Sequence, residues 1–108
     1  MAEWTFVTNH GSVLALVAER GRTTAREIAL ALGITERSVH RIISDLEEAG
    51  YIERKRDGRV NYYRVNEELP MRRPEIQHVL VRDWIDLLKH ADGATQALTP
   101  GKMKAGAR

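Results

Sequence analysis

The sequence contains no cysteine among its 108 residues. Disulfide bonds and thiolate metal sites are therefore excluded, and a reducing cytoplasm is the simplest compartment for the chain. No stretch approaches the roughly 18 consecutive apolar residues that can cross a bilayer. The opening residues, MAEWTFVTNHG, lack the basic and apolar regions of a secretory signal. These absences favour a cytoplasmic protein without a membrane segment.

Net charge is also small, at +2, so charge alone gives no evidence of nucleic-acid binding. Its distribution along the chain is uneven. Residues 1–34 hold three acids and three bases, whereas residues 54–59 hold four bases and one acid. Residues 101–108 add Lys102, Lys104 and Arg108 without any acid. Positive charge is therefore concentrated at two short sites.

Residues 24–49, TAREIALALGITERSVHRIISDLEEA, predict two helices separated by a short turn. Thr24 and Glu27 have the spacing of a capping box, in which each side chain satisfies a backbone N–H of the first turn. Gly33 supplies the left-handed residue that ends the first helix. Thr35 then caps the second helix through its hydroxyl.

The second helix, residues 35–49, has two distinct sides. Its apolar residues recur at helical spacing and predict one buried stripe: Val39, Ile42, Leu46 and Ala49. The opposite side is polar: Glu36, Arg37, Ser38, His40, Arg41, Ser44 and Asp45. Two short helices joined by a glycine-containing turn form the helix-turn-helix pattern, whose second helix enters the DNA major groove. An ordinary helix pair with a solvated polar face is the alternative interpretation.

Residues 51–65, YIERKRDGRVNYYRV, predict a β-hairpin. Asp57-Gly58 is a strong signal for a two-residue turn with positive φ at both positions. Placing the turn there predicts that Arg56 faces Arg59 and that Ile52 faces Tyr63.

In that register Ile52, Tyr63 and Val65 share the core side of the hairpin, because a slip of one residue would expose them. The expected Arg56–Arg59 pair would place like charges across the strands, which destabilises an isolated hairpin. A bound polyanion would remove this repulsion. The alternative is that Lys55 and its arginine neighbours protect an exposed sheet edge from aggregation.

The flanking segments predict further elements. Thr8 or Asn9 is expected to cap a first helix that runs to about Glu19, and the extended residues 22–23 have the length of a short third strand. Pro74 fits the first turn of a last helix, predicted over residues 74–92. Residues 94–108 lack periodicity and are predicted to be a disordered basic tail.

The predicted last helix is apolar over much of its circumference. Its stripe consists of Ile76, Leu80, Trp84, Leu87 and Leu88. A small domain cannot cover so much apolar surface, so we expect a second copy to cover it in a two-fold dimer. Trp4 and Phe6 are expected to pack on the body of the domain or on a second subunit, because exposed aromatic side chains on a short arm are unfavourable. We assign them to the same dimer interface. Folding of the last helix back onto its own domain is the alternative.

The order of elements predicts a mainly α fold with a small β-hairpin: a winged helix-turn-helix with a three-helix core, a wing and a C-terminal dimerisation helix. We expect one domain over residues 1–93. The segment GITERSVHRIISDLEEAGYIERKRDGRVNYYRV resembles the recognition helix and wing of the MarR- and ArsR-type regulators. WTFVTNHGSVLALVAERG before it and LPMRRP after it resemble short MarR-like proteins of bacteria.

This resemblance implies a transcriptional regulator that binds double-stranded DNA as a homodimer. Carried over position by position, the recognition contacts are Thr35, Arg37, Ser38, His40 and Arg41. The wing contacts, within residues 54–59, are Arg54, Arg56 and Arg59. Longer MarR proteins form a ligand pocket with their flanking helices. This chain has one helix on each side of the DNA-reading core, so its residues do not support a small-molecule effector.

The remaining residues show no signature of an enzyme or of a metal site. No nucleophile with its base, phosphate loop or carboxylate pair is evident, so neither catalysis nor a cofactor is expected. Asp86 and His90 have i, i+4 spacing, but no third ligand accompanies them. The rival function is a winged helix that only contacts other proteins, in which case the basic hairpin tip would meet an acidic partner.

Overall fold

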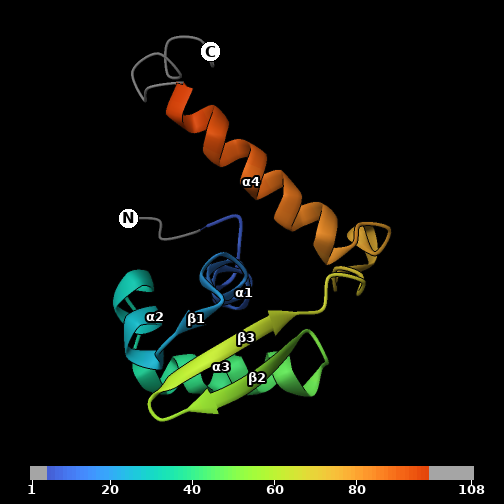
Figure 1. Ribbon diagram of the computed structural model, residues 1–108. Helices are drawn as coiled ribbons and strands as arrows, with labels where there is room; N and C mark the ends of the chain where they lie inside the picture. Colours follow the sequence, from blue (N-terminus) through green and yellow to red (C-terminus); the bar gives the residue numbers. More distant parts are fainter. Residues whose placement is uncertain (1–4, 98–108) are drawn as a thin grey trace. The chain divides into compact units, whose positions relative to one another are not determined.

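The computed structural model of the chain describes residues 5–97, with side chains described as far as residue 89. It divides into two compact units, Met1–Glu67 and Glu68–Arg108. The first unit contains α1 (Asn9–Arg20), β1 (Arg22–Thr23), α2 (Ala25–Leu32), α3 (Glu36–Glu48), β2 (Ile52–Asp57) and β3 (Val60–Val65) (Figure 1). The second contains a 3-10 turn, η1 (Pro74–Ile76), and α4 (Val81–Ala97). Three helices followed by a hairpin wing and a further helix confirm the predicted winged helix.

The helix boundaries follow from local capping. The Thr8 hydroxyl accepts a hydrogen bond from the backbone N–H of Gly11 and starts α1. Thr24 and Glu27 form the complete capping box of α2, as predicted. Gly21 and Gly33 end α1 and α2 with φ of 71° and 69°, a left-handed conformation that a side chain disfavours. Capping therefore sets the spacing between α2 and α3.

The core of the first unit lies between α3, the other two helices and the inner face of the sheet. Val39, Ile42 and Leu46 of α3 are buried as predicted, and Ile43 is buried beside them. Ala49 was expected in this stripe but is the exposed C-cap of α3. The helix ends there because Gly50 takes a φ of 86°. The buried stripe fixes which side of α3 faces outward.

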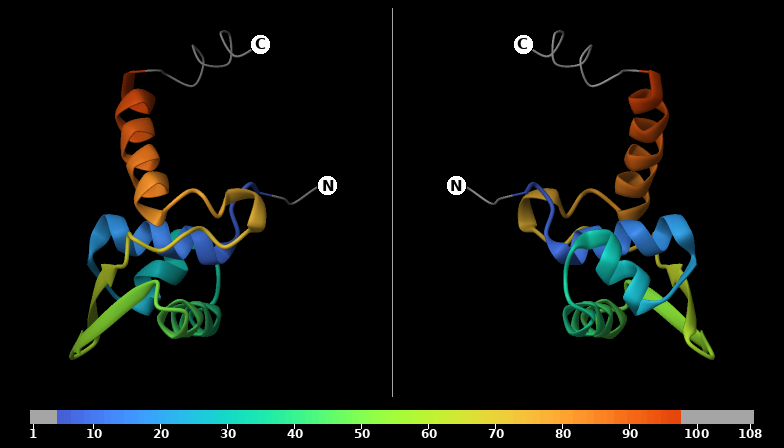
Figure 2. Two further views of the ribbon diagram at one scale, coloured as in Figure 1. Left: turned by 90° about the vertical axis from the view of Figure 1, so that its right-hand side faces the viewer. Right: turned by 90° about the vertical axis from the view of Figure 1, so that its left-hand side faces the viewer.

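The sheet has the strand order β1-β3-β2, and both pairings are antiparallel. Residues 22–23 pair with Asn61 and Tyr62, which confirms the short third strand. The hairpin tip extends away from the three helices (Figure 2).

The predicted hairpin register is wrong, because the two-residue turn lies one residue later in the chain than predicted. Asp57 pairs with Val60, so the turn residues are Gly58 and Arg59 rather than Asp57 and Gly58. Among residues 5–97 positive φ occurs only at glycines, and Gly58 has a φ of 67° while Arg59 does not. A two-residue turn with glycine first is of type II′, which needs positive φ only once. The predicted type I′ turn would have forced Asp57 into that conformation.

This correction removes the expected like-charge pair. Arg56 faces Asn61 instead of Arg59, and Ile52 faces Val65 instead of Tyr63. Each partner has moved by two positions, and an even shift keeps every side chain on its predicted face. Ile52 and Tyr63 are accordingly buried as expected.

In the second unit the predicted helix over residues 74–92 begins too early. Only Pro74–Ile76 form a 3-10 turn, and α4 starts at Val81. Two backbone hydrogen bonds join the segments on either side of this turn, from Met71 N to Val79 O and from Val81 N to Leu69 O, both at 2.8 Å. This pairing holds residues 79–80 extended, so no helix can run through them.

A side-chain hydrogen bond marks the start of α4. The Asp83 carboxylate accepts a hydrogen bond from the backbone N–H of Leu80 at 3.1 Å and caps the first turn. The helix continues to Ala97, so residues 94–97 belong to it rather than to the predicted tail. Residues 98–108 lie outside the described part of the chain. Within the described ranges, no helix has the length and apolar character needed to cross a bilayer.

Candidate nucleic-acid interface

The polar side of α3 carries a group of exposed basic side chains near its N-terminus. Arg37, His40 and Arg41 are all exposed, because Val39, Ile42 and Ile43 turn the opposite side into the core. Among residues 5–89, whose side chains the structure describes, no ion pair involves these three residues. Their N–H groups are therefore available to an external acceptor.

Thr35 and Ser38 lie beside this group but have a structural task. The Thr35 hydroxyl accepts from the backbone N–H of Ser38 and donates to the Ser38 hydroxyl, both at 3.0 Å. This cap replaces a hydrogen bond that the first turn of a helix lacks. Both predicted contact residues are thus next to the arginines, and both hydroxyls already take part in the cap.

His10, for which the sequence predicts no role, contacts α3. His10 Nε2 and Asp45 Oδ2 are 2.7 Å apart, and both side chains are about half exposed. The contact joins the first turn of α1 to α3. The contact gives the Asp45 carboxylate a partner on another helix. Sequence spacing gives no sign of the contact, since 35 residues separate the two.

The wing positions its basic residues in different ways. Arg59 is exposed at the second position of the turn. Arg56 folds back along the tip, where its Nε donates to the Gly58 carbonyl at 2.9 Å. Lys55 pairs with Tyr62 and therefore lies on the outer face of the hairpin. The tip therefore presents Arg56 and Arg59, as predicted.

Arg54 does not belong to the tip. Its Nη2 lies 3.2 Å from Oε1 of Glu47, in the last turn of α3. The sequence prediction treated it as a wing contact with DNA and did not identify Glu47 as its partner. The correct hairpin register would have shown Arg54 on the core-facing side, opposite Tyr63.

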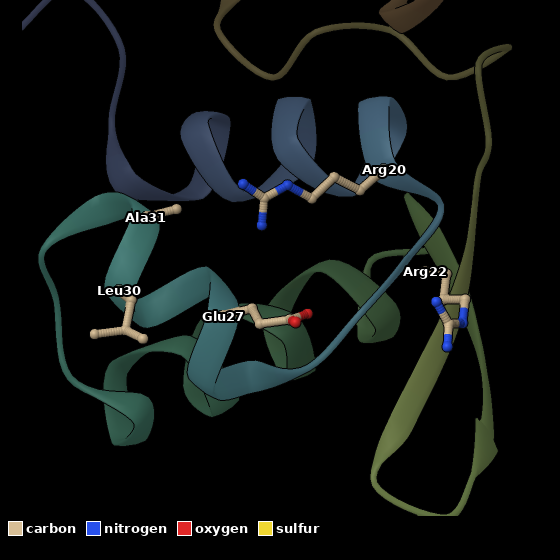
Figure 3. Close-up of a pocket in the computed structure, with 5 residues that line it drawn as sticks. All are labelled: Arg20, Arg22, Glu27, Leu30 and Ala31. Atoms are coloured by element: carbon tan, nitrogen blue, oxygen red, sulfur yellow. The ribbon is translucent and has the colours of Figure 1, made fainter.

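A shallow hollow of about 590 Å³ lies beside α2. Figure 3 shows the residues that line it: Arg20 at the end of α1, Arg22 on β1, and Glu27, Leu30 and Ala31 on α2. Hydrogen bonds from Thr23 and Thr24 lower the pKa of Glu27, and Arg20 and Arg22 lower it further. Glu27 is thereby committed to the capping box. Within the described residues no three metal-ligating side chains cluster.

The predicted interface residues differ in exposure. Phe6 is 93% exposed, Leu87 64% and Leu88 39%. Trp84 is partly covered, whereas its neighbours Val81 and Ile85 are buried. Ile76 and Leu80 precede α4 and cannot continue its stripe. Trp4 lies outside the described residues.

Comparison with known proteins places this fold in context. The chain is similar to MepR, a transcription regulator of the Staphylococcus aureus multidrug efflux pump MepA, with a TM-score of 0.54 and 18% identity over 94% of this chain and 74% of that one. It is also similar to a variant of Lactococcus lactis ZitR (0.50, 19% identity, 97% and 70% covered) and to T. potens IscR (0.52, 16% identity, 85% and 91% covered). These likenesses establish the winged-helix fold.

Sequence comparison adds a relative and a family. The chain is 33% identical over 66 residues to the uncharacterized protein MJ1254 of the archaeon Methanocaldococcus jannaschii. That match covers 60% of this chain but only 14% of the relative, so the chain spans about one seventh of its length. The model of the MarR family matches residues 7–60, from the segment before α1 to the first residue of β3. With half of its residues matched, and with the helix-turn-helix and most of the wing inside the match, the chain belongs to the MarR family.

Proposed function

We propose that the chain is a transcriptional regulator that binds specific sequences in double-stranded DNA. The MarR family is a family of regulators rather than of enzymes, which agrees with the lack of catalytic groups noted in the sequence. The observation that carries the proposal is the exposed group Arg37, His40 and Arg41, which has no ion pair within residues 5–89.

In this proposal the two elements of the first unit have different tasks. The N-terminal half of α3 enters the major groove, where Arg37 or Arg41 reads a guanine through a bidentate contact. His40 contacts a neighbouring base edge, and Thr35 and Ser38 approach the backbone from the cap. Arg56 and Arg59 bind phosphates or the adjacent minor groove, which adds affinity for every sequence.

We also propose that the protein acts as a homodimer through α4. The support is apolar surface on a helix that follows the DNA-reading unit: Trp84, Leu87 and Leu88. Phe6 adds exposed aromatic surface from the N-terminal segment. Two-fold symmetry would then appear in the DNA as a palindromic site, with half-sites about 34–36 Å apart.

The dimer proposal has a direct test. Trp84→Glu places a charge in the proposed interface and is expected to give monomers in light scattering, whereas Lys89→Glu, an exposed change on the same helix, leaves the dimer intact. A dimer that survives Trp84→Glu would place the interface elsewhere.

The DNA proposal is tested by selecting bound sequences from random duplexes. A recovered site shows specificity, and its symmetry reports on the dimer. Binding to random duplex at low salt that falls steeply as salt rises is the expected companion result. Failure to bind any duplex, combined with binding to an acidic protein, would favour the rival function of a protein-contact module.

A further inference from the structure

The ion pair between Glu47 and Arg54 joins the two elements that are proposed to touch DNA. Glu47 belongs to the last turn of α3, and Arg54 is the third residue of β2. Both side chains are 31% exposed, whereas the cross-strand pair Arg64–Glu53 is 79% and 71% exposed. A partly covered pair is screened less by solvent than a surface pair and is correspondingly stronger.

The direction of the Arg54 side chain follows from the hairpin register. Arg54 pairs with Tyr63, which is buried, and lies two residues from buried Ile52. Alternation along a strand puts these side chains on one face. Burial raises the pKa of Tyr63. The hydrogen bond from Asn61 and the charge of Arg54 lower it, and the charge of Glu47 raises it. Four side chains from α3, β2 and β3 thus meet under the wing.

This arrangement attaches β2, the edge strand of the wing, to α3 beyond its buried base. The chain links α3 to β2 through residues 49–51, and buried Tyr51 and Ile52 fix the base of the hairpin. Arg54 is attached about 7 Å further along the strand, since each residue advances it by about 3.4 Å. Beyond this pair every residue from Lys55 to Arg59 is exposed. β3 is held on its other side by β1, which pairs with Asn61 and Tyr62. β2 is the edge strand of the sheet, and the ion pair ties this edge directly to α3.

We propose that Glu47 and Arg54 are positioning residues that hold the wing at the angle to α3 at which both can reach one duplex. The inference rests on the proposed DNA-binding function. It assigns Arg54 to an ion pair with α3 rather than to a phosphate, in contrast to the role carried over from the family resemblance. It also gives a function to an acidic residue next to a surface that is proposed to bind a polyanion.

The sign of one mutational effect separates positioning from simple electrostatics. Removing an acid near DNA strengthens binding if only charge matters. Positioning predicts that Glu47→Ala weakens binding. Glu48→Ala is the matched control, because Glu48 is an exposed neighbour that forms no ion pair among the described side chains. Both variants remove one negative charge from the same helix end.

The expected result is that Glu47→Ala binds the selected duplex about threefold to fivefold more weakly than Glu48→Ala, which is the range that a partly exposed pair can supply. Arg54→Ala shows the same loss, and the double variant Glu47→Ala/Arg54→Ala loses no more than either single variant. The salt slope stays at the wild-type value, because no phosphate contact has been removed. The charge-swapped pair, Glu47→Arg with Arg54→Glu, recovers binding.

A second readout uses the protein without DNA. Because the chain has no cysteine, Ser44→Cys on α3 and Lys55→Cys on β2 accept spin labels at those two positions alone. Pulsed electron spin resonance should give a narrow distance distribution in this labelled protein and a broader one when Glu47→Ala is added. Thermal melting checks that every variant is folded.

The outcomes are distinct. If wild type and Glu48→Ala bind no duplex, the proposed function fails, and the spin-label distances still decide whether the pair positions the wing. If DNA binds but Glu47→Ala equals or exceeds Glu48→Ala and the distances do not broaden, the positioning role is wrong. An Arg54→Ala variant whose salt slope falls by about one unit, with Glu47→Ala binding more tightly, would return Arg54 to the phosphate backbone.

Discussion

α3 and the wing are held in place by different kinds of contact. α3 buries Val39, Ile42, Ile43 and Leu46 and leaves its basic residues without ion pairs inside residues 5–89. In β2 of the wing every residue from Glu53 to Asp57 is exposed. Arg54 pairs with Glu47 of α3, and Arg56 donates to the Gly58 carbonyl of the turn. Apolar packing therefore leaves the polar side of α3 available for recognition. The exposed part of β2 instead uses two arginines in contacts within the protein.

The largest expected effect tests the packing half of this comparison. Ile43→Ala removes a fully buried side chain from α3 and should lower the free energy of unfolding by about 2–5 kcal/mol. Lys55→Ala, in the exposed part of the wing, should change it by less than about 0.5 kcal/mol. Urea unfolding measures both. Similar losses at the two sites would mean that the wing is as tightly packed as the helix.

The next effect tests recognition by α3. Arg41→Ala or Arg37→Ala should cost about 1–3 kcal/mol in binding and relax the preference at one base position, because a bidentate guanine contact is lost. Repeating the selection with each variant measures this directly. If both variants keep the wild-type preference, the arginines do not read bases and α3 binds the backbone only.

At the wing tip we expect a smaller loss of affinity that does not depend on the DNA sequence. Arg59→Ala should weaken binding to specific and random duplexes alike and reduce the salt slope by about one unit. The turn itself is not disturbed, since Arg59 lacks a positive φ. Titrations at several salt concentrations give the slope. A change confined to one base position would instead make the wing a sequence reader.

The smallest effect concerns acid stability of the helix-turn-helix. The pKa of Glu27 is lowered from its ordinary value of 4.5 by hydrogen bonds from Thr23 and Thr24. A lowered folded pKa contributes stability that is present above the unfolded value and is lost as pH falls through the folded pKa. Wild type should therefore lose more stability than Glu27→Gln as pH falls below about 4.5. Parallel curves in melting experiments would show that the capping carboxylate does not contribute.

The parts of the structure that were predicted from sequence are those governed by neighbouring residues. Thr24 with Glu27, Gly33 and Thr35 each act within one helical turn, so spacing alone locates the caps. The buried stripe of α3 follows from the same periodicity. The exposed positions of Arg37, His40 and Arg41 were predicted for this reason, although their contacts with DNA remain predictions.

The turn position, the start of α4 and the Glu47–Arg54 ion pair were not predicted, because the local sequence fits more than one arrangement at each of them. A two-residue turn accepts Gly58 at either central position, so composition could not choose between Asp57-Gly58 and Gly58-Arg59. The start of α4 depends on the pairing of residues 69–71 with residues 79–81, which no local pattern announces. The partnership of Glu47 with Arg54 required the correct register. Bacterial origin and the ArsR resemblance remain predictions.

In the turn of the wing, one residue provides the positive φ and its neighbour provides the charged side chain. Gly58 alone carries the unusual backbone conformation. Arg59 stands beside it with an ordinary one, so almost any side chain can occupy that position without reshaping the hairpin. A single base change in the gene could therefore exchange the chemistry at the extremity of the wing while the scaffold stays intact.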